Sequence, residues 1–213
     1  MNKRLLLSLS LLACLAGGCK PLGYLAYLFA PDLGKVTVPA EFDRLQGKKV
    51  AVVLFTDEAT QVDYPYARWT LSQQIEAALK ANVRKIDVVP IQRVIRYQDE
   101  NIEWNSVDRT RVGKDLGADY VLYVAVEEYS TLEPGSMSLF RGRISARASV
   151  FDTSLAERAA CVWRSKPIRV VYPESAPARL AQDDREIRYR AEQLFAQELV
   201  RKFYTHKVPK EQG

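Results

Sequence analysis

Few side chains in this sequence have the type and spacing that catalysis needs. His206 is the only histidine in the chain, which disfavours a histidine metal site and a Ser-His-Asp triad. Asp57, Glu58 and Asp63 follow an apolar segment, where an open α/β sheet would place a ligand. These carboxylates predict either a cation or acid–base site, or a solvated loop with a helix-capping role. We expect no catalytic residue, metal or dissociable cofactor, and an enzyme that uses the acidic loop is the alternative.

The N-terminal residues carry a processing pattern. Lys3 and Arg4 precede an apolar run over residues 5–15, and the small residues Ala16, Gly17 and Gly18 follow it. A basic start, a short apolar run and small residues together are typical of a secretory signal peptide. The run is shorter than the ~20 residues that a membrane-spanning helix needs. We therefore predict a signal peptide over residues 1–18.

Two cysteines, Cys14 and Cys19, lie at the end of this run. Small residues followed by a cysteine at the end of an apolar run resemble the lipobox of bacterial lipoproteins. The resemblance implies that the Cys19 thiol receives a diacylglycerol and that the new amine receives an acyl chain such as palmitate. Cys14 is the alternative because Leu11 lies three residues before it, although bulky Leu12 stands where a small residue is preferred. An ordinary cleaved signal with incidental cysteines is a further alternative.

A lipid on Cys19 would fix the location of the protein. Each buried CH₂ group contributes ~0.8 kcal/mol, so two or three acyl chains would hold the chain on a membrane. The residue after Cys19 is Lys20 and not aspartate. By the sorting rule of enteric lipoproteins, this favours the outer membrane. The sequence therefore predicts a cell-envelope protein, anchored by lipid and facing the periplasm.

The composition is that of an ordinary globular protein. The chain has 213 residues, of which 47% are hydrophobic and 27% charged. Removal of Lys3 and Arg4 with the signal lowers the net charge from +5 to about +3, which gives no reason to expect a nucleic-acid partner. Cys161 is then the only thiol of the folded part. We predict that it is buried and inert, with no internal disulfide.

The first half of the mature chain alternates between apolar strands and amphipathic helices. The predicted strands cover residues 50–55, 86–90 and 118–129, and the predicted helices cover 70–82, 91–100 and 107–117. Ser106 is the expected cap of the third helix and Gly117 its end. Residues 56–65 are predicted to be a loop. Helical crossovers between apolar strands imply parallel pairing.

The second half has a different pattern. Apolar and polar residues alternate over 138–152, which predicts a strand with one face on the core and one in water. Residues 158–173 are predicted to return as its antiparallel partner. A long amphipathic helix follows over 183–204. We predict an α/β fold with α+β character in the second half: a mixed sheet with parallel first strands, an antiparallel hairpin and a C-terminal helix.

These elements define the expected organisation of the chain. The predicted signal peptide over 1–18 is followed by an anchor and linker over 19–48. A single α/β domain covers 49–204, since no internal repeat or second boundary is visible. Residues 205–213 are predicted to be a polar, frayed tail.

Three segments resemble a known group of envelope proteins. They are VAVVLF, DLGADYVLYVAVEEY, and the hairpin SARASVFDTSLAERAACVW with Asp152 and Trp163. The group contains the curli-assembly (CsgG-like) lipoproteins, the lipoprotein activators of penicillin-binding proteins and the N-terminal domain of the Tol translocation protein. The resemblance implies a two- or three-layer sandwich like the anticodon-binding domain. It also implies a non-enzymatic protein that binds other envelope proteins as an assembly or accessory factor, with a homo-oligomer as the alternative.

Two groups of side chains are candidates for partner binding. Arg141, Arg143 and Arg147 share one face of the alternating strand and could meet acidic or phosphate groups. The alternative is a solvated face on which Glu127 and Glu128 pair with them. The second group is aromatic: Tyr64, Tyr66 and Trp69 either form an exposed surface or belong to the core.

Overall fold

The computed structural model describes residues 35–136, 138–174, 179–180 and 184–209. The predicted signal peptide, Cys14 and Cys19 lie outside these residues. The chain divides into two compact units, of which the first comprises Met1–Val38 with Lys207–Gly213 and the second Pro39–His206. In the first unit, strand β1 (Lys35–Val38) pairs with β9 (His206–Pro209). The frayed tail predicted from residue 205 therefore begins with a paired strand, and part of the predicted linker is its partner.

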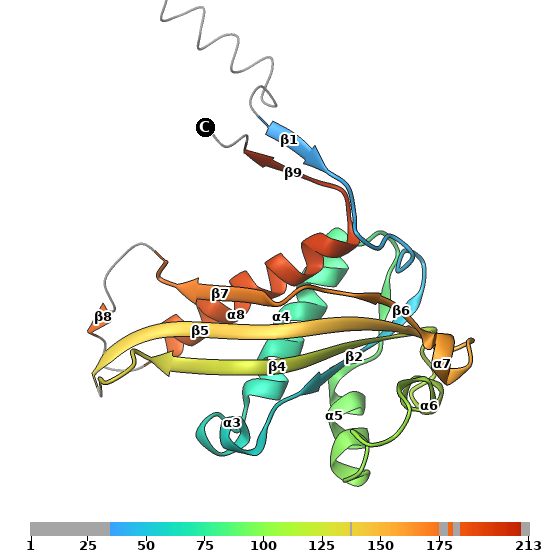
Figure 1. Ribbon diagram of the computed structural model, residues 1–213, viewed down its shortest axis with the longest axis horizontal. Helices are drawn as coiled ribbons and strands as arrows, with labels where there is room; N and C mark the ends of the chain where they lie inside the picture. The colour runs from blue at the N-terminus through green and yellow to red at the C-terminus, as the bar shows by residue number, and fades with distance from the viewer. Residues whose placement is uncertain (1–34, 137, 175–178, 181–183, 210–213) are drawn as a thin grey trace, which may run out of the picture. The chain divides into compact units, whose positions relative to one another are not determined.

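The second unit is built on a mixed sheet (Figure 1). Strand β2 (Lys49–Phe55) pairs in parallel with β3 (Asp87–Val88) on one side and with β4 (Tyr120–Leu132) on the other. The five inner residues of β2 are fully buried, as its unbroken apolar sequence predicts. Helices α3 (Glu58–Asp63) and α4 (Ala67–Asn82) connect β2 to β3. Helices α5 (Ile91–Glu100) and α6 (Arg109–Asp115) connect β3 to β4.

The antiparallel half of the sheet is centred on the long strand β5 (Leu139–Asp152). Strand β4 lies along one edge of β5, and three short strands share the other edge. These are β6 (Cys161–Arg164), β7 (Ile168–Tyr172) and β8 (Arg179–Leu180). The predicted return strand is thus divided: short helix α7 (Glu157–Ala160) precedes β6, and Pro167 lies between β6 and β7. A proline lacks the amide hydrogen that a continuous strand would use.

Two apolar clusters cover the two faces of the sheet. The larger one packs α4 and α8 (Arg185–Val200), which lie side by side in Figure 1, against the alternating buried residues of β2, β4 and β5. Gly142 of β5 permits this contact, because a Cβ there would lie 2.6 Å from the Cβ of Ala191. The smaller cluster lies on the opposite face and includes Val94 of α5 and Val112 of α6. The α/β fold with parallel first strands, an antiparallel hairpin and a C-terminal helix is therefore confirmed.

Several local predictions need correction. The acidic segment after β2 is not a loop but contains α3, because the Asp57 side chain caps this helix by accepting from the Thr60 amide at 2.8 Å. The cap of α6 is Asp108, which accepts from the Thr110 amide, and not Ser106. Part of the predicted linker belongs to the core, since Phe42 and Leu45 are buried in the larger cluster. By contrast, Gly117 follows the helix with φ +66°, as a helix-ending glycine should.

Candidate functional site

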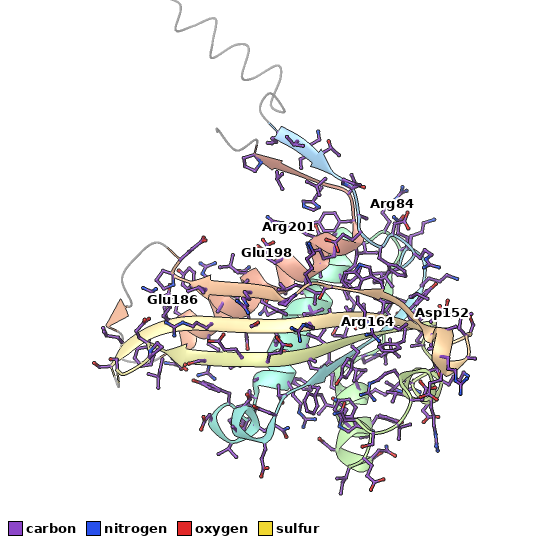
Figure 2. All side chains as sticks on the ribbon, in the orientation of Figure 1. Arg84, Asp152, Arg164, Glu186, Glu198 and Arg201 are labelled. Atoms are coloured by element: carbon purple, nitrogen blue, oxygen red, sulfur yellow. The ribbon has the colours of Figure 1, made fainter. Side chains whose placement is uncertain are left out.

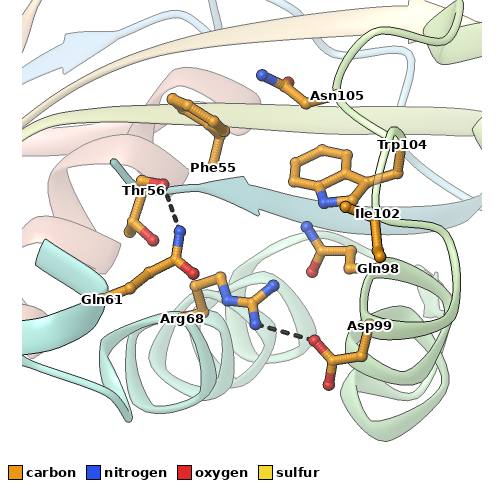
Figure 3. A pocket seen from close by; sticks show the side chains of 9 residues that line it. All are labelled: Phe55, Thr56, Gln61, Arg68, Gln98, Asp99, Ile102, Trp104 and Asn105. Atoms are coloured by element: carbon orange, nitrogen blue, oxygen red, sulfur yellow. Dashed lines mark hydrogen bonds and ion pairs between the residues drawn. The ribbon is translucent and has the colours of Figure 1, made fainter. Parts of the chain in front are cut away.

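A crevice opens where the parallel strands end. Its volume is about 370 Å³, and nine residues line it: Phe55, Thr56, Gln61, Arg68, Gln98, Asp99, Ile102, Trp104 and Asn105 (Figure 3). We call this feature the crevice. The chain leaves β2 toward α4, which packs on the larger cluster, but it leaves β3 toward α5 and α6, which contribute to the smaller one. The carboxyl edge of a sheet at such a change of side is where open α/β folds bind ligands.

The short length of β3 creates the crevice. Its two residues pair only with Lys49 and Val50 of β2. Beyond Val50, the main-chain carbonyls on that edge of β2 need other partners. Gln98 of α5 supplies one, since its Nε2 donates to the Leu54 carbonyl oxygen at 2.8 Å. At the base of the crevice, the carboxamide of Gln98 thus makes a hydrogen bond that a longer neighbouring strand would otherwise make.

Two buried oxygens in the crevice have no hydrogen-bond partner among the described residues. They are Oγ1 of Thr56 and Oε1 of Gln98, and their residues are only 2% and 3% exposed. Figure 3 shows both side chains directed into the space between α3, α4 and α5. A buried polar atom without a partner costs about 1–3 kcal/mol, so each such atom in a folded protein needs an explanation.

Polar groups at the mouth of the crevice compensate one another. Arg68 of α4 pairs with Asp99 of α5 at 3.0 Å, which joins the two helices across the opening (Figure 3). Gln61 of α3 donates to the Thr56 carbonyl oxygen at 2.8 Å. The crevice therefore carries no uncompensated charge. Its chemistry is neutral hydrogen bonding by a hydroxyl and three carboxamides, those of Gln61, Gln98 and Asn105.

Aromatic side chains form one wall of the crevice. The Trp104 ring makes edge contacts with Phe55 and Tyr123, with centroid distances of 6.3 and 6.4 Å. Arg109 lies 4.5 Å above the Tyr123 ring and donates to Asn105, so this wall is held rigidly. Next to it, the Ile102 side chain is 91% exposed. The wall is thus buried, whereas the rim offers an aliphatic side chain to solvent.

The acidic residues predicted from the sequence do not line the crevice. Asp57, Glu58 and Asp63 are exposed, and the Asp57 carboxylate is engaged in capping, which lowers its pKa through its hydrogen bond to Thr60. Among the described residues, no group of three histidine, cysteine, aspartate or glutamate side chains could hold a metal ion. Asp57 therefore has the helix-capping role that the sequence left open as an alternative to a binding or catalytic role. The rule that ligands bind at the carboxyl edge of the sheet predicted the position of the crevice, but the residues that line the crevice are mainly uncharged.

The predicted arginine face consists of ion pairs. Arg141 and Arg143 both approach Oε2 of Glu133, at 3.1 and 2.9 Å, and Arg147 pairs with Glu127 at 2.6 Å. The Arg141 contact is close in distance but lacks the angles of a hydrogen bond. Pairing was the alternative that the sequence left open, with Glu133 in the place expected for Glu128. Partner binding by these arginines remains a prediction.

The three predicted aromatic residues differ in their environments. Tyr64 and Trp69 are half-buried against the larger cluster, and the Tyr64 hydroxyl accepts from the Thr131 amide at 3.1 Å. Tyr66 is 70% exposed and stands at the start of α4. Of the three, Tyr66 alone has the exposure that a binding residue needs.

The predicted burial of Cys161 is wrong, because the thiol is half-buried at the start of β6. The Arg164 Nε donates to its Sγ at 3.0 Å. Arg164, labelled in Figure 2, and Cys161 line a hollow together with Asn105, which also lines the crevice. A single half-exposed thiol with one arginine contact defines no site.

A second polar cluster, which the sequence did not reveal, lies beneath α8. Glu192 is 2% exposed, and its Oε1 accepts from the hydroxyls of Thr70 and Tyr129, the latter at 2.6 Å. Burial raises the pKa of Glu192. Burial also raises the pKa of Tyr129, and the neighbouring carboxylate adds to this effect. We call Thr70, Tyr129 and Glu192 the Glu192 cluster, and it joins α4, β4 and α8.

Comparison with known proteins gives a limited result. No family model and no curated protein matches the chain. Solved structures that match the chain include a PelC dodecamer from Paraburkholderia phytofirmans, at 14% identity and a TM-score of 0.43, covering 78% of this chain and 97% of that one. Lipoprotein GNA1162 from Neisseria meningitidis has 18% identity and a TM-score of 0.38, covering 60% and 83%. A candidate lipoprotein from Caulobacter crescentus has 15% identity and a TM-score of 0.34, covering 70% and 83%.

These neighbours are bacterial lipoproteins and an oligomeric PelC. At such identities and TM-scores, the likeness establishes neither a family nor a function for this chain. Membership of the curli-assembly-like group remains a prediction. Within the described residues, no helix is long and apolar enough to cross a membrane.

Proposed function

We propose that this chain is a lipid-anchored protein of the cell envelope that binds other envelope proteins as an accessory or assembly factor. The observation that carries the proposal is the N-terminal pattern, in which a basic start and an apolar run over 5–15 lead to Ala16-Gly17-Gly18-Cys19. The acceptor of the lipid is Cys19. The anchor is a diacylglycerol with an added acyl chain such as palmitate, and the expected location is the outer membrane, facing the periplasm.

The chemistry of the crevice supports binding over catalysis. Thr56 is the only hydroxyl residue that lines it, and this hydroxyl has no partner among the described residues. No base is therefore placed to activate it as a nucleophile. The single carboxylate, Asp99, is paired with Arg68. Neutral groups that accept and donate hydrogen bonds suit recognition.

The N-terminal peptide tests the anchor directly. We would measure its mass in protein extracted from membranes, for wild type, Cys19→Ser and Cys14→Ser. We expect the lipid on wild type and Cys14→Ser, and its loss with release from the membrane fraction in Cys19→Ser. A lipid that persists in Cys19→Ser and disappears in Cys14→Ser would move the anchor to Cys14. An unmodified N-terminus after residue 18 in the wild type would refute the lipid-anchored function.

A homo-oligomeric subunit is the second candidate function. The exposed apolar side chains Val62, Tyr66 and Ile102 favour a contact with protein, which could be another copy of this chain. Sedimentation velocity of the detergent-extracted protein over a range of concentrations tests this candidate. A monomer at all concentrations would exclude it.

An enzyme that uses the acidic segment is the remaining candidate, and the capping role of Asp57 is sufficient to explain that residue. Substitution of Asp57 and Asp63 tests it, because an unchanged cellular phenotype would remove the enzymatic role.

A further inference from the structure

We propose that the crevice binds an extended peptide segment of a partner protein, with peptide N–H groups donating to Gln98 Oε1 and Thr56 Oγ1. The inference rests on the proposed function, since it names the surface through which a binding protein would hold its partner. It also replaces the arginine face as the main candidate, because the arginines already have carboxylate partners.

The unpaired oxygens define what the ligand must offer. Oε1 of a glutamine carboxamide can only accept a hydrogen bond, and the Nε2 of Gln98 is already used by the Leu54 carbonyl. A ligand that satisfies Gln98 must therefore present a donor. The same donor-bearing ligand can satisfy Thr56, whose hydroxyl both accepts and donates.

Charge excludes an ionic ligand as the best fit. The one charged pair lining the crevice, Arg68 with Asp99, is internally neutralised at 3.0 Å. The guanidinium of Arg68 would repel a cation, and the Asp99 carboxylate and the Gln98 side-chain oxygen would repel an anion. A neutral N–H donor meets neither difficulty. The peptide group is such a donor and also offers an acceptor to the side-chain amide of Asn105.

The rim distinguishes a peptide from a neutral sugar. Sugars stack on exposed aromatic rings, but Trp104 in the wall is only 7% exposed. The exposed apolar group at the mouth is instead the aliphatic Ile102. The segments around the crevice also expose Val62 of α3 and Tyr66 before α4. A polar base surrounded by exposed apolar side chains fits an interface with protein, in which side chains of the partner cover the rim.

In the free protein, the side chain of Gln61 lies at the base of the crevice. Gln61, itself exposed, bonds to the Thr56 main chain beside both buried oxygens (Figure 3). An incoming peptide would take the place of the Gln61 side chain, which can rotate into solvent. The Gln61 hydrogen bond to Thr56 is therefore exchanged on binding, and the two unpaired oxygens gain partners.

A defined peptide library tests the proposal. The probe is a phage-displayed library of random twelve-residue peptides, selected against the full-length protein in detergent. Affinities of synthetic versions of the enriched peptides are then measured by calorimetry. The variants are Thr56→Val, which removes a hydroxyl that makes no hydrogen bond to the described residues, and Ile102→Glu, which changes an exposed side chain. Neither change should prevent folding.

The matched control is Leu155→Glu. Leu155 is also an exposed aliphatic residue, but it lies beside Asp152 at the opposite edge of the sheet. We expect Thr56→Val and Ile102→Glu to weaken binding at least about tenfold and Leu155→Glu to leave it unchanged. No enriched peptide, or equal affinities for wild type and both crevice variants, would overturn the proposal. Binding of N-acetylglucosamine in the crevice, with no peptide bound there, would also overturn it.

These outcomes separate the crevice from the proposed function. If Cys19 carries lipid and crosslinking in cells from Arg147 captures one reproducible envelope protein, while the crevice variants bind peptides normally, the crevice inference alone is wrong. If the wild-type N-terminus carries no lipid, the proposed function fails independently of the peptide results.

Discussion

The crevice and the Glu192 cluster are both buried and polar, but they differ in how completely their hydrogen bonds are made. In the Glu192 cluster, Thr70 and Tyr129 donate to one carboxylate oxygen. In the crevice, Thr56 Oγ1 and Gln98 Oε1 have no partner among the described residues. Both clusters stand between the same sheet and its helices. The difference indicates that the Glu192 cluster serves stability and that the crevice retains its unpaired oxygens for a ligand.

The neighbourhood of the Glu192 cluster extends this pattern. Thr131 donates to Asp184 at 2.7 Å, and Asp184 pairs with Arg188 at the start of α8. The Nε of Arg188 is the exception, since this buried atom has no hydrogen-bond partner within the part of the chain that the structure describes. A network of this kind fixes α8 on the sheet, because breaking one member leaves others unpaired.

The largest expected effect is that of Glu192→Ala. The substitution leaves the Tyr129 hydroxyl without an acceptor among the described residues, and leaves the Thr70 hydroxyl only the Tyr66 carbonyl oxygen at 3.1 Å. We expect a loss of roughly 3 kcal/mol in the free energy of unfolding, measured by urea denaturation. Glu192→Gln is the control, because a carboxamide oxygen can still accept both hydrogen bonds. A loss below about 1 kcal/mol for Glu192→Ala would contradict a stabilising role.

Tyr129→Phe should have a smaller effect. It removes the hydroxyl but keeps the ring, which packs on Tyr64 with a centroid distance of 4.9 Å. Glu192 keeps its bond from Thr70, so we expect a loss of about 1–1.5 kcal/mol in the same assay. An unchanged stability would show that the Tyr129 hydroxyl contributes nothing to the cluster.

The ionisation of Glu192 predicts a pH dependence with a definite sign. Burial raises the pKa of Glu192 above its ordinary value of 4.5, so the folded state binds more protons than the unfolded state above that pH. The contribution of this group to stability is therefore greatest at low pH and falls as pH rises from about 4.5 to the folded pKa. Denaturation of wild type and Glu192→Gln across this range should differ by this slope. Parallel curves would contradict the raised pKa.

The smallest effect is expected at the arginine face. The Arg147 side chain is largely exposed and that of Glu127 is 36% exposed, and ion pairs at the surface contribute little. We expect Arg147→Ala to change the free energy of unfolding by less than about 0.5 kcal/mol. A change above about 1 kcal/mol would show that the pair stabilises the sheet, and would leave less reason to consider Arg147 free to bind a partner.

Much of the fold could be predicted from the sequence, because the spacing of apolar residues along the chain reflects the type of element and the face that it buries. The alternation over 138–152 predicted the buried residues from Gly142 to Val150 except Ser145, which was expected to face water and is buried. The unbroken apolar run of β2 predicted a doubly covered strand. The helix at 91–100 was predicted at its observed limits. Short features were missed where a single side chain decides the structure, as with the Asp57 cap of α3.

The crevice could be predicted only as a location. The carboxyl-edge rule pointed to the segment after β2 and drew attention to its charged residues, whereas the base of the crevice is made by Thr56 and by Gln98 from a distant helix. That pairing depends on β3 being only two residues long, which leaves the Leu54 carbonyl to Gln98. The Glu192 cluster was hidden for the same reason, since its members come from three elements far apart in the sequence.

The most direct test of the account compares two threonine-to-valine changes of equal size. Thr70→Val removes a hydroxyl that donates to Glu192, whereas Thr56→Val removes one that has no partner among the residues described. Urea denaturation should show that Thr70→Val lowers the free energy of unfolding by about 1–2 kcal/mol. Thr56→Val should leave it unchanged or raise it by up to about 1 kcal/mol. If Thr56→Val instead destabilises the protein as much as Thr70→Val does, the Thr56 hydroxyl is a structural group, and the crevice is not held open for a ligand.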